Sequence, residues 1–326
     1  MKRIERTRLT LLLMLASPQF AFGASSRADA QWPTSTVRLV VPFPPGGSSD
    51  VLGRLIAENL GKVLAANFIV ENKPGATTQI GSELVAKARP DGYTLLLASA
   101  SAFTALPNLR TLNFSVDSFE IAGGVADYVA LMAVRKDLPV QSVREFVEHA
   151  RANPGKLSFG SAGEASAGHI FGLTLARDTG IKVLHVPFRG SAAAVNALVG
   201  GDIDFIIDGA VAPMIQADRV RALATFNRRR HPSFPDLPTV AETGFEISAT
   251  RSAGWGLLAP KGTPVSIMAR LSEALKQVLG QQDVAEILAR ANSIPSWQEP
   301  DIYRHGLESD RKMYAELLPA IGIKGE

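Results

Sequence analysis

The sequence predicts an α/β protein with two lobes joined by two crossings of the chain. Strand-like and helix-like segments alternate along most of residues 36–226, which favours parallel sheets with helices on both faces. Two apolar stretches, 128–138 and 252–260, are each flanked by segments of different sheet units. We expect these stretches to be the crossings, and a double crossing makes a hinge between lobes and a cleft that can close on a ligand.

The crossings define the expected domains. Residues 31–130 form the first part of lobe 1, residues 131–252 form lobe 2, and residues 253–326 complete lobe 1. Because lobe 1 is built from both ends of the chain, we expect its C-terminal segment to return from lobe 2.

The first thirty residues are typical of a secretory signal peptide. Basic residues precede the apolar run "LTLLLMLA", and small residues follow it in "AFGASSRADA". The run is far shorter than the roughly 20 residues that span a bilayer. We expect cleavage after Ala30, where Ala28 and Ala30 fit the A-x-A rule, with a cut near Ala24 as the second choice.

Charge and cysteine content exclude several classes of protein. The sequence has 34 basic and 31 acidic residues, of which the leader contains five basic and two acidic ones. The mature chain therefore has 29 basic and 29 acidic residues. A neutral chain lacks the basic surplus of a nucleic-acid-binding protein, and we interpret "NRRRH" at 227–231 as a solvated loop. Cysteine is absent, so no disulfide, zinc–thiolate site or thiol nucleophile can form.

The elements of lobe 1 follow from periodicity and turn signals. A strand at 36–43 precedes a helix from Asp50, which Ser49 or Asp50 can cap. The next elements are a strand and turn at 67–75, a helix at 80–88 and a strand at 93–99. Residues 101–127 form a looser stretch to which no element is assigned.

Lobe 2 resumes the alternation. The expected helices are 142–154, 166–180 and 191–201, and the expected strands are 156–162, 183–188, 203–209 and 220–226. His185 lies inside one of these strands, so we expect it in the core. The tail from Pro264 to Ile323 is mostly helical.

Several loops at the carboxyl ends of the expected strands consist largely of Gly, Ser, Ala and Pro. They are residues 44–50, 98–102, 160–169, 188–194 and 208–213. Ligands of parallel α/β sheets bind at this edge, where glycine permits close approach, serine offers a hydroxyl and helix N-termini carry partial positive charge. The first loop, "PPGGSSD", therefore predicts a rigid cradle for a carboxylate or phosphate.

Motifs for catalysis, nucleotides and metals are missing from the sequence. It has no G-x-S-x-G elbow, GxxxxGK[ST], GxGxxG or HExxH, and no convergent set of metal ligands. His169 begins a helix after a serine-rich loop, where it either bonds a ligand or merely packs. Asp208 ends "IDFIID", and without a nucleophile or metal beside it we prefer a lobe-to-lobe or ligand-hydroxyl hydrogen bond to general-base catalysis.

Blocks along nearly the whole mature chain resemble the periplasmic substrate-binding receptors of tripartite tricarboxylate transporters, often called Bug proteins. Among them are "VRLVVPFPPGGSSDVLGRLIAENL", "NPGKLSFGSAGEASAGHIFG", "HVPFRGSAAAVNALVGGDIDFIIDG" and "GWGLLAPKGTP". The resemblance implies a two-lobed periplasmic-binding-protein fold of the Venus flytrap type, type II-like, that captures small organic acids for membrane subunits.

The resemblance also implies the binding positions. In lobe 1 they are Phe43, Gly47, Ser48, Asp50, Ser99 and Ser101, and in lobe 2 they are Ser161, Ala162, Gly163, Ser166, His169 and Asp208. Family ligands are held mainly by main-chain amides, small hydroxyls and water. This sequence departs from the family at 77–79, where "TTQ" replaces a Gly-Gly-Asn-like run.

The sequence leads to one preferred function and two alternatives. We expect a periplasmic, monomeric receptor without cofactor, metal or catalysis, which traps a di- or tricarboxylate or an aromatic acid for transporter subunits, although family members can lack an obvious transporter. The first alternative is an exported α/β hydrolase with Ser161 or Ser48 as nucleophile and His169 as base. The second is a ligand sensor for a membrane signalling protein.

Overall fold

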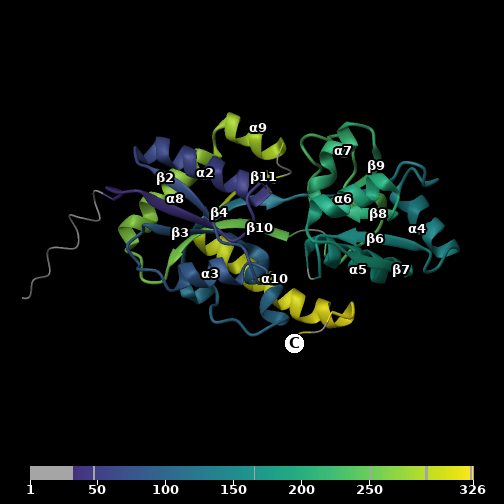
Figure 1. Cartoon of the computed structure of the whole chain (residues 1–326), viewed down its shortest axis with the longest axis horizontal. Coiled ribbons are helices and arrows are strands. Elements are labelled where there is room, and N and C mark those ends of the chain that lie inside the picture. The colour runs from purple at the N-terminus through teal and green to yellow at the C-terminus, as the bar shows by residue number, and fades with distance from the viewer. Residues whose placement is uncertain are drawn as a thin grey trace, which may run out of the picture.

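The computed structural model describes residues 32–46, 48–164, 166–249, 252–290, 293–323 and 325. The expected leader and its cleavage site after Ala30 lie outside these residues. The described chain forms two sheets with helices on both faces (Figure 1), which confirms the α/β fold class. We call the six-stranded sheet with its helices lobe 1, and the five-stranded sheet with its helices lobe 2.

The sheet of lobe 1 has the strand order β11-β4-β10-β3-β1-β2. Its strands are β1 (Val37–Val41), β2 (Phe68–Asn72), β3 (Thr94–Ser99), β4 (Phe119–Tyr128), β10 (Ser252–Pro260) and β11 (Ser293–Gln298). β1 pairs in parallel with β2 and β3, whereas β10 and β11 are antiparallel to β4. The sheet is therefore mixed rather than parallel, because the chain that returns from lobe 2 enters at the carboxyl edge and must run backwards.

The sheet of lobe 2 has the strand order β7-β6-β8-β5-β9. Its strands are β5 (Ala130–Arg135), β6 (Leu157–Ser161), β7 (Val183–Pro187), β8 (Phe205–Ile207) and β9 (Val220–Phe226). β6 is parallel to β7 and β8, and β5 is antiparallel to β8 and β9. This sheet is mixed for the same reason, since β5 enters from lobe 1.

The two apolar stretches that were expected to be crossings are mostly strands. β4 ends at Tyr128 and β5 begins at Ala130, so the first passage between sheets is far shorter than 128–138. The stretch 252–260 is β10, which lies within the sheet of lobe 1. The expected domain boundaries themselves stay a prediction.

Each face of each sheet has its own apolar core. In lobe 1, α2 (Ser48–Leu64), α8 (Val265–Leu279) and α9 (Gln282–Arg290) cover one face, while α3 (Gln79–Ala86) and the start of α10 (Pro300–Ala320) cover the other. In lobe 2, α6 (Ser191–Gly200) and α7 (Ala212–Gln216) lie opposite α4 (Val143–Ala152) and α5 (Ala167–Thr179). None of the helices among the described residues is long and apolar enough to cross a membrane.

Two strands of lobe 1, β4 and β11, were not predicted. β4 lies in the stretch that looked loose, and it contains Gly123 and Gly124. A Cβ on Gly123 would lie 2.4 Å from the Trp297 ring of β11, and one on Gly256 of β10 would lie 2.4 Å from the Tyr303 ring of α10. These glycines make room for aromatic side chains, which explains why a strand of low β propensity lies between β11 and β10.

The last helix, α10, joins the cores of the two lobes. Tyr303 and Leu307 in its first half pack into the core that α10 shares with α3. Tyr314, Leu317 and Leu318 in its second half belong to the core of lobe 2 beneath α4 and α5. The segment after β10 thus adds helices and a strand to lobe 1 and also contacts lobe 2 through α10.

We predict that Leu317→Ala lowers the free energy of unfolding by about 2–5 kcal/mol, because it opens a cavity at a side chain that is 4% exposed. The matched control is Ile302→Ala on the same helix, where the side chain is 61% exposed. The control should stay within about 0.5 kcal/mol of the parent. Urea unfolding measures both, and equal losses would contradict the insertion of α10 into the core of lobe 2.

Candidate functional site

The carboxyl edges of the two sheets meet at a hydrogen bond. β4 ends at Tyr128 in lobe 1, and Asp208 follows β8 in lobe 2. The Tyr128 hydroxyl donates to Asp208 Oδ1 at 2.9 Å. Since β1, β2 and β3 run in the same direction as β4, and β6 and β7 in the same direction as β8, the loops after these strands lie at the two joined edges.

The first loop of lobe 1 is held in shape by Asp50. Asp50 Oδ2 accepts from the Gly46 amide at 2.9 Å and from Arg54 Nε at 3.0 Å, and Oδ1 accepts from Asn72 Nδ2 at 2.9 Å. Burial alone would raise the pKa of Asp50, but these hydrogen bonds and the Arg54 charge lower it below its usual range. Both carboxylate oxygens therefore have protein partners, in the loop, in α2 and in β2, so Asp50 shapes the cradle.

The remaining predicted positions of lobe 1 lie close to Asp50 in the chain or at the end of β3. Asn72 Nδ2 also donates to the carbonyl of Phe43 at 3.1 Å, which ties the start of the loop to β2. Ser99 Oγ and Ser101 Oγ lie 2.9 Å apart and share a hydrogen bond. Gly47 lies outside the described residues, and Ser48 is the first residue of α2.

The turn before α3 has an unusual backbone. Ala76, Thr77 and Thr78 have φ values of 46°, 51° and 77°, so three consecutive non-glycine residues lie in the left-handed region. This conformation costs about 1–2 kcal/mol per residue for L-amino acids, and most for a β-branched one. It is the segment in which the family resemblance leads one to expect glycines.

In lobe 2, Ser161 and Ser166 organise the loop between β6 and α5. Ser161 Oγ donates to the Gly163 carbonyl at 2.9 Å and accepts from the Gly163 amide at 3.2 Å. Ser166 Oγ bonds the same carbonyl at 2.7 Å and caps α5 by accepting from the His169 amide at 3.4 Å. Ala162 lies within this turn, so the predicted positions of lobe 2 before Asp208 form one loop.

A stacked pair of histidines lies beneath this loop. The rings of His169 and His185 are 3.8 Å apart and nearly parallel, at 14°. His185 Nε2 lies 2.7 Å from Ser161 Oγ, and its ring also packs on Phe159, its partner in the β6–β7 register. His185 is half-buried at the edge of the sheet, so the expectation that it belongs to the core is wrong.

Both histidines are neutral at neutral pH. Burial, followed by the charge of His185, lowers the pKa of His169 to about 4, and burial also lowers the pKa of His185. A neutral imidazole can donate or accept one hydrogen bond at each nitrogen but brings no positive charge. The pair therefore contributes shape and hydrogen bonding to the site, rather than a cation.

Asp208 accepts hydrogen bonds from both lobes. Besides Tyr128, it accepts from Ser191 Oγ in the first turn of α6 at 2.7 Å and from the Ala210 amide at 2.9 Å. The Tyr128 hydroxyl in turn accepts from the Gly209 amide at 2.8 Å. Burial and the Asp208 charge raise the pKa of Tyr128 well above its usual value, so this hydroxyl stays protonated and keeps donating.

Four residues of this arrangement were not singled out from the sequence. Tyr128 ends β4 and Ser191 begins α6, whereas His185 lies within β7 and Trp255, whose ring packs on Tyr128, lies within β10. The face of β7 on which His185 lies could be predicted from the sequence, because His185 alternates with Val183 and Pro187 and thus shares a face with them. The contacts of Tyr128 and Trp255 could not be predicted in this way, since their partners are distant in the sequence.

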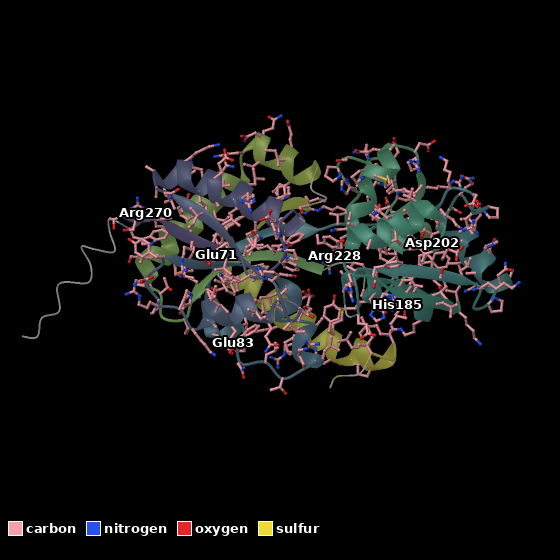
Figure 2. The ribbon with its side chains drawn as sticks, viewed as in Figure 1. Glu71, Glu83, His185, Asp202, Arg228 and Arg270 are labelled. Carbon is pink, nitrogen blue, oxygen red and sulfur yellow. The ribbon has the colours of Figure 1, made fainter. Side chains whose placement is uncertain are left out.

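The basic run at 227–231 lies beside the connection between the lobes. Arg228, Arg229 and Arg230 are exposed, in agreement with a solvated loop, and Figure 2 shows Arg228 where the two lobes meet. Arg229 pairs with Asp127 of β4 at 3.5 Å, and Arg230 pairs with Glu242 at 3.0 Å. Within the described residues, His, Asp and Glu form no group of three that could hold a metal ion.

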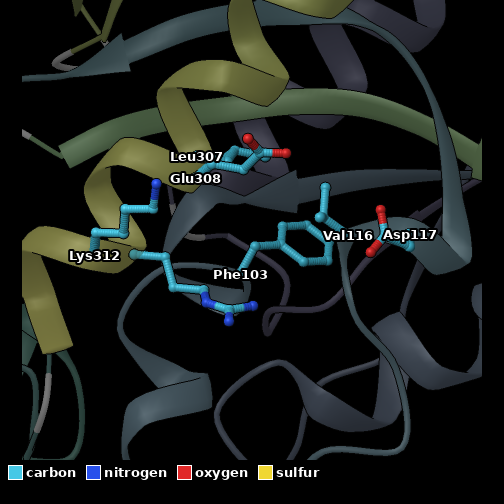
Figure 3. A pocket seen from close by; sticks show the side chains of 7 residues that line it. Phe103, Val116, Asp117, Leu307, Glu308 and Lys312 are labelled. Carbon is cyan, nitrogen blue, oxygen red and sulfur yellow. The ribbon is translucent and has the colours of Figure 1, made fainter.

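A cavity of about 250 Å³ lies elsewhere, between α10 and the chain around Phe103 (Figure 3). Its charged lining residues are Asp117, Glu308, Arg311 and Lys312. A carboxylate there would meet as many like charges as opposite ones, and none of the predicted binding residues lines the cavity. The chemistry expected of an anion site is therefore at the joined edges rather than in this cavity.

Comparison with known proteins agrees with this geometry. The family described as "Tripartite tricarboxylate transporter family receptor" matches residues 52–304. The chain belongs to this receptor family. The periplasmic binding protein BugD has a similar structure, with a TM-score of 0.78 and 31% identity over 90% of this chain and 100% of BugD.

Two similar structures contain dicarboxylates. A protein of R. palustris solved with adipate has a TM-score of 0.82 and 30% identity over 90% of this receptor and 100% of that protein. MatC from Rhodopseudomonas palustris, solved with bound malate, has a TM-score of 0.75 and 29% identity over 88% of this receptor and 100% of MatC. The two-lobed fold of periplasmic solute-binding proteins is thus shared across nearly the whole described chain.

We predict that the stability of the receptor rises with pH between about 4 and 6.5. An unfolded histidine binds a proton near pH 6.5, whereas folded His169 does so only near 4, so acidification favours the unfolded chain. By pH 4 this effect should cost on the order of 3 kcal/mol, and His169→Gln should remove it. His185, whose pKa burial also lowers, and His231, whose pKa burial lowers to about 4, should keep part of the pH dependence in this variant.

Urea unfolding from pH 4 to 7.5 tests this dependence. The control is Leu184→Gln, next to His185 on β7, where the side chain is 57% exposed and does not titrate. The free energy of unfolding of the control should depend on pH as steeply as that of the parent. A slope that is equally steep in His169→Gln and in the parent would contradict the assignment to His169.

We predict that Thr77→Gly stabilises the protein by about 0.5–1 kcal/mol. Glycine removes the cost of the left-handed conformation, which exceeds the entropy that glycine adds to the unfolded chain. The exposed side chain of Thr77 takes little packing with it. Thr111→Gly, at an exposed residue with negative φ, should instead destabilise, and thermal unfolding that ranks the two variants the other way would contradict the strain.

Proposed function

We propose that this protein is a periplasmic receptor that traps a small organic carboxylate and releases it unchanged to the membrane subunits of a tripartite tricarboxylate-type transporter. The ligand is a di- or tricarboxylate or an aromatic acid. The receptor acts as a monomer, after export and cleavage following Ala30. Its ligand lies between two lobes. One lobe consists of residues 31–130 and 253–326, and the other consists of residues 131–252.

The observation that supports this proposal is the chemistry of the joined edges. α2, α5 and α6 begin there, so their N-terminal amides direct partial positive charge toward the space at these edges. Ser99 and Ser101 add hydroxyls from lobe 1, and Ser166 adds one from lobe 2. Arg54 of α2, which contacts the first loop, is paired with Asp50. Fixed amides and hydroxyls suit a carboxylate and need no bond making.

The hydrolase alternative is less well supported. Ser161 is 0% exposed and its Oγ bonds both the amide and the carbonyl of Gly163, so a substrate carbonyl has no open approach to it. The partner of Ser161 is His185 rather than the expected base His169. A serine held in this way supports the loop that binds the ligand.

We predict that the mature chain is stabilised by a subset of carboxylates. A ligand at about 100 times its dissociation constant that binds only the folded state adds roughly 2.7 kcal/mol, which thermal unfolding detects easily. The panel should include mono-, di-, tri- and aromatic carboxylates, with the ligand recovered and its mass measured. Turnover of the ligand, or no shift across the panel in ligand-free protein, would contradict the receptor.

A pair of variants locates the effect. Ser101→Ala removes a partly exposed hydroxyl at the joined edge, and loss of a hydrogen bond to a charged group should weaken binding by about 10- to 100-fold. Ser35→Ala removes an exposed hydroxyl near the opposite end of β1 and should leave affinity unchanged. Equal affinities in the two variants would place the ligand elsewhere.

A further inference from the structure

Tyr128 is in contact with both lobes through different parts of its side chain. It is the last residue of β4, and it packs against the α2 and α8 core of lobe 1 and against the α4 and α5 core of lobe 2. Its hydroxyl bonds Asp208 and the Gly209 amide of lobe 2. A side chain with these contacts is sensitive to the position of one lobe relative to the other.

The ring of Tyr128 leads to the first loop of lobe 1. It packs edge-to-face on Trp255 of β10, with ring centroids 5.8 Å apart and an angle of 78°. Trp255 Nε1 donates to Ser49 Oγ at 3.1 Å, and Ser49 lies in the first turn of α2. Trp255 and Ser49 are both buried, so this contact is held without competition from water.

The hydroxyl of Tyr128 leads to the first turn of α6 in lobe 2. Asp208 accepts from Tyr128 on Oδ1 and from Ser191 on Oδ2, and Ser191 is the first residue of α6. Asp208 is 4% exposed, and a buried carboxylate keeps its position only while its donors do. One continuous set of contacts thus joins the N-terminus of α2 to that of α6, with Tyr128 at its centre.

We propose that Tyr128 is a positioning residue that fixes the spacing between the lobe 1 half and the lobe 2 half of the anion site. This inference rests on the proposed function. A ligand with two carboxylates uses both halves at once, so its affinity depends on their spacing. A ligand with one carboxylate can use a single half and is insensitive to it. Tyr128 therefore sets the preference for diacids over monoacids of the same length.

The test is Tyr128→Phe, which keeps the ring and removes the hydroxyl. Binding is measured by calorimetry for two matched pairs of acids, adipate with hexanoate and phthalate with benzoate. We expect the diacid to bind about tenfold more weakly and the monoacid to change by less than about twofold, since only the diacid loses the advantage of two linked contacts. A loss of the same factor for both members of a pair, or for neither, would overturn the proposal.

Tyr303→Phe is the matched control. Tyr303 is also a buried tyrosine of lobe 1, and its hydroxyl has no hydrogen-bond partner among the described residues. Its removal should leave both affinities within about twofold of the parent, because it bonds neither half of the site. If Tyr303→Phe reproduced the selective loss of diacid affinity, the effect would be a general property of the fold and the role of Tyr128 would be refuted.

A second readout needs no ligand and separates this inference from the proposed function. Hydrogen exchange followed by NMR reports the Gly209 amide in lobe 2 and the indole N–H of Trp255 in lobe 1. Tyr128→Phe should speed exchange at both positions, and Tyr303→Phe at neither. Faster exchange at Gly209 alone would mean that Tyr128 contacts lobe 2 without linking it to lobe 1, and would overturn the proposal. This outcome can be read whether or not any carboxylate binds to the parent.

Discussion

The arrangement of the two lobes depends on the buried carboxylate of Asp208. Burying a charge costs several kcal/mol unless hydrogen bonds replace its water. Asp208 is 4% exposed, and its donors come from β4 of lobe 1, from α6 and from its own turn. These donors meet only if the carboxyl edges of both sheets point toward one another. The requirement to satisfy one carboxylate thus places the loops of both lobes within a single site.

The connections between the lobes restrict how that site can open. The passage from β4 to β5 is short, so a hinge at this point permits rotation and little translation. α10 adds a contact of another kind, because its two halves are packed in the cores of different lobes. A rotation of lobe 2 must therefore move the second half of α10 with it, or slide Leu317 and its neighbours against the core. The helix resists large displacements and leaves small ones possible.

The sequence predicts what depends on local pattern. Most helices, the strands of alternating units and the serine-rich loops follow from periodicity and turn residues, and the structure places those loops at the strand ends. β4 is different, because Gly123 has low β propensity and its place is decided by the Trp297 ring. Strand direction in β5 and β10 is likewise set by the path of the chain between the sheets.

The site residues divide in the same way. Ser161 is the last residue of β6 and Asp208 directly follows β8, so their location could be predicted from their place in the chain. The partners that position them, His185 and Tyr128, become neighbours only through sheet register and lobe contact. Local sequence therefore indicates which groups can touch a ligand, and tertiary structure decides which groups hold them.

The predicted contact residues in the described part of the chain supply no free positive charge for a carboxylate. Arg54 is neutralised by Asp50, and the stacked histidines are uncharged at neutral pH. Helix N-termini then supply part of the attraction for the proposed carboxylate, each worth about 0.3–1 kcal/mol at an exposed site and up to about 2 kcal/mol when partly buried. Arg189, which is exposed in the loop after β7, adds a positive charge on the side of lobe 2. Contributions of this size from α2, α5 and α6 add up only while the lobes keep their spacing, so separation of the lobes would leave each half with its own share and weaken the hold on the proposed ligand.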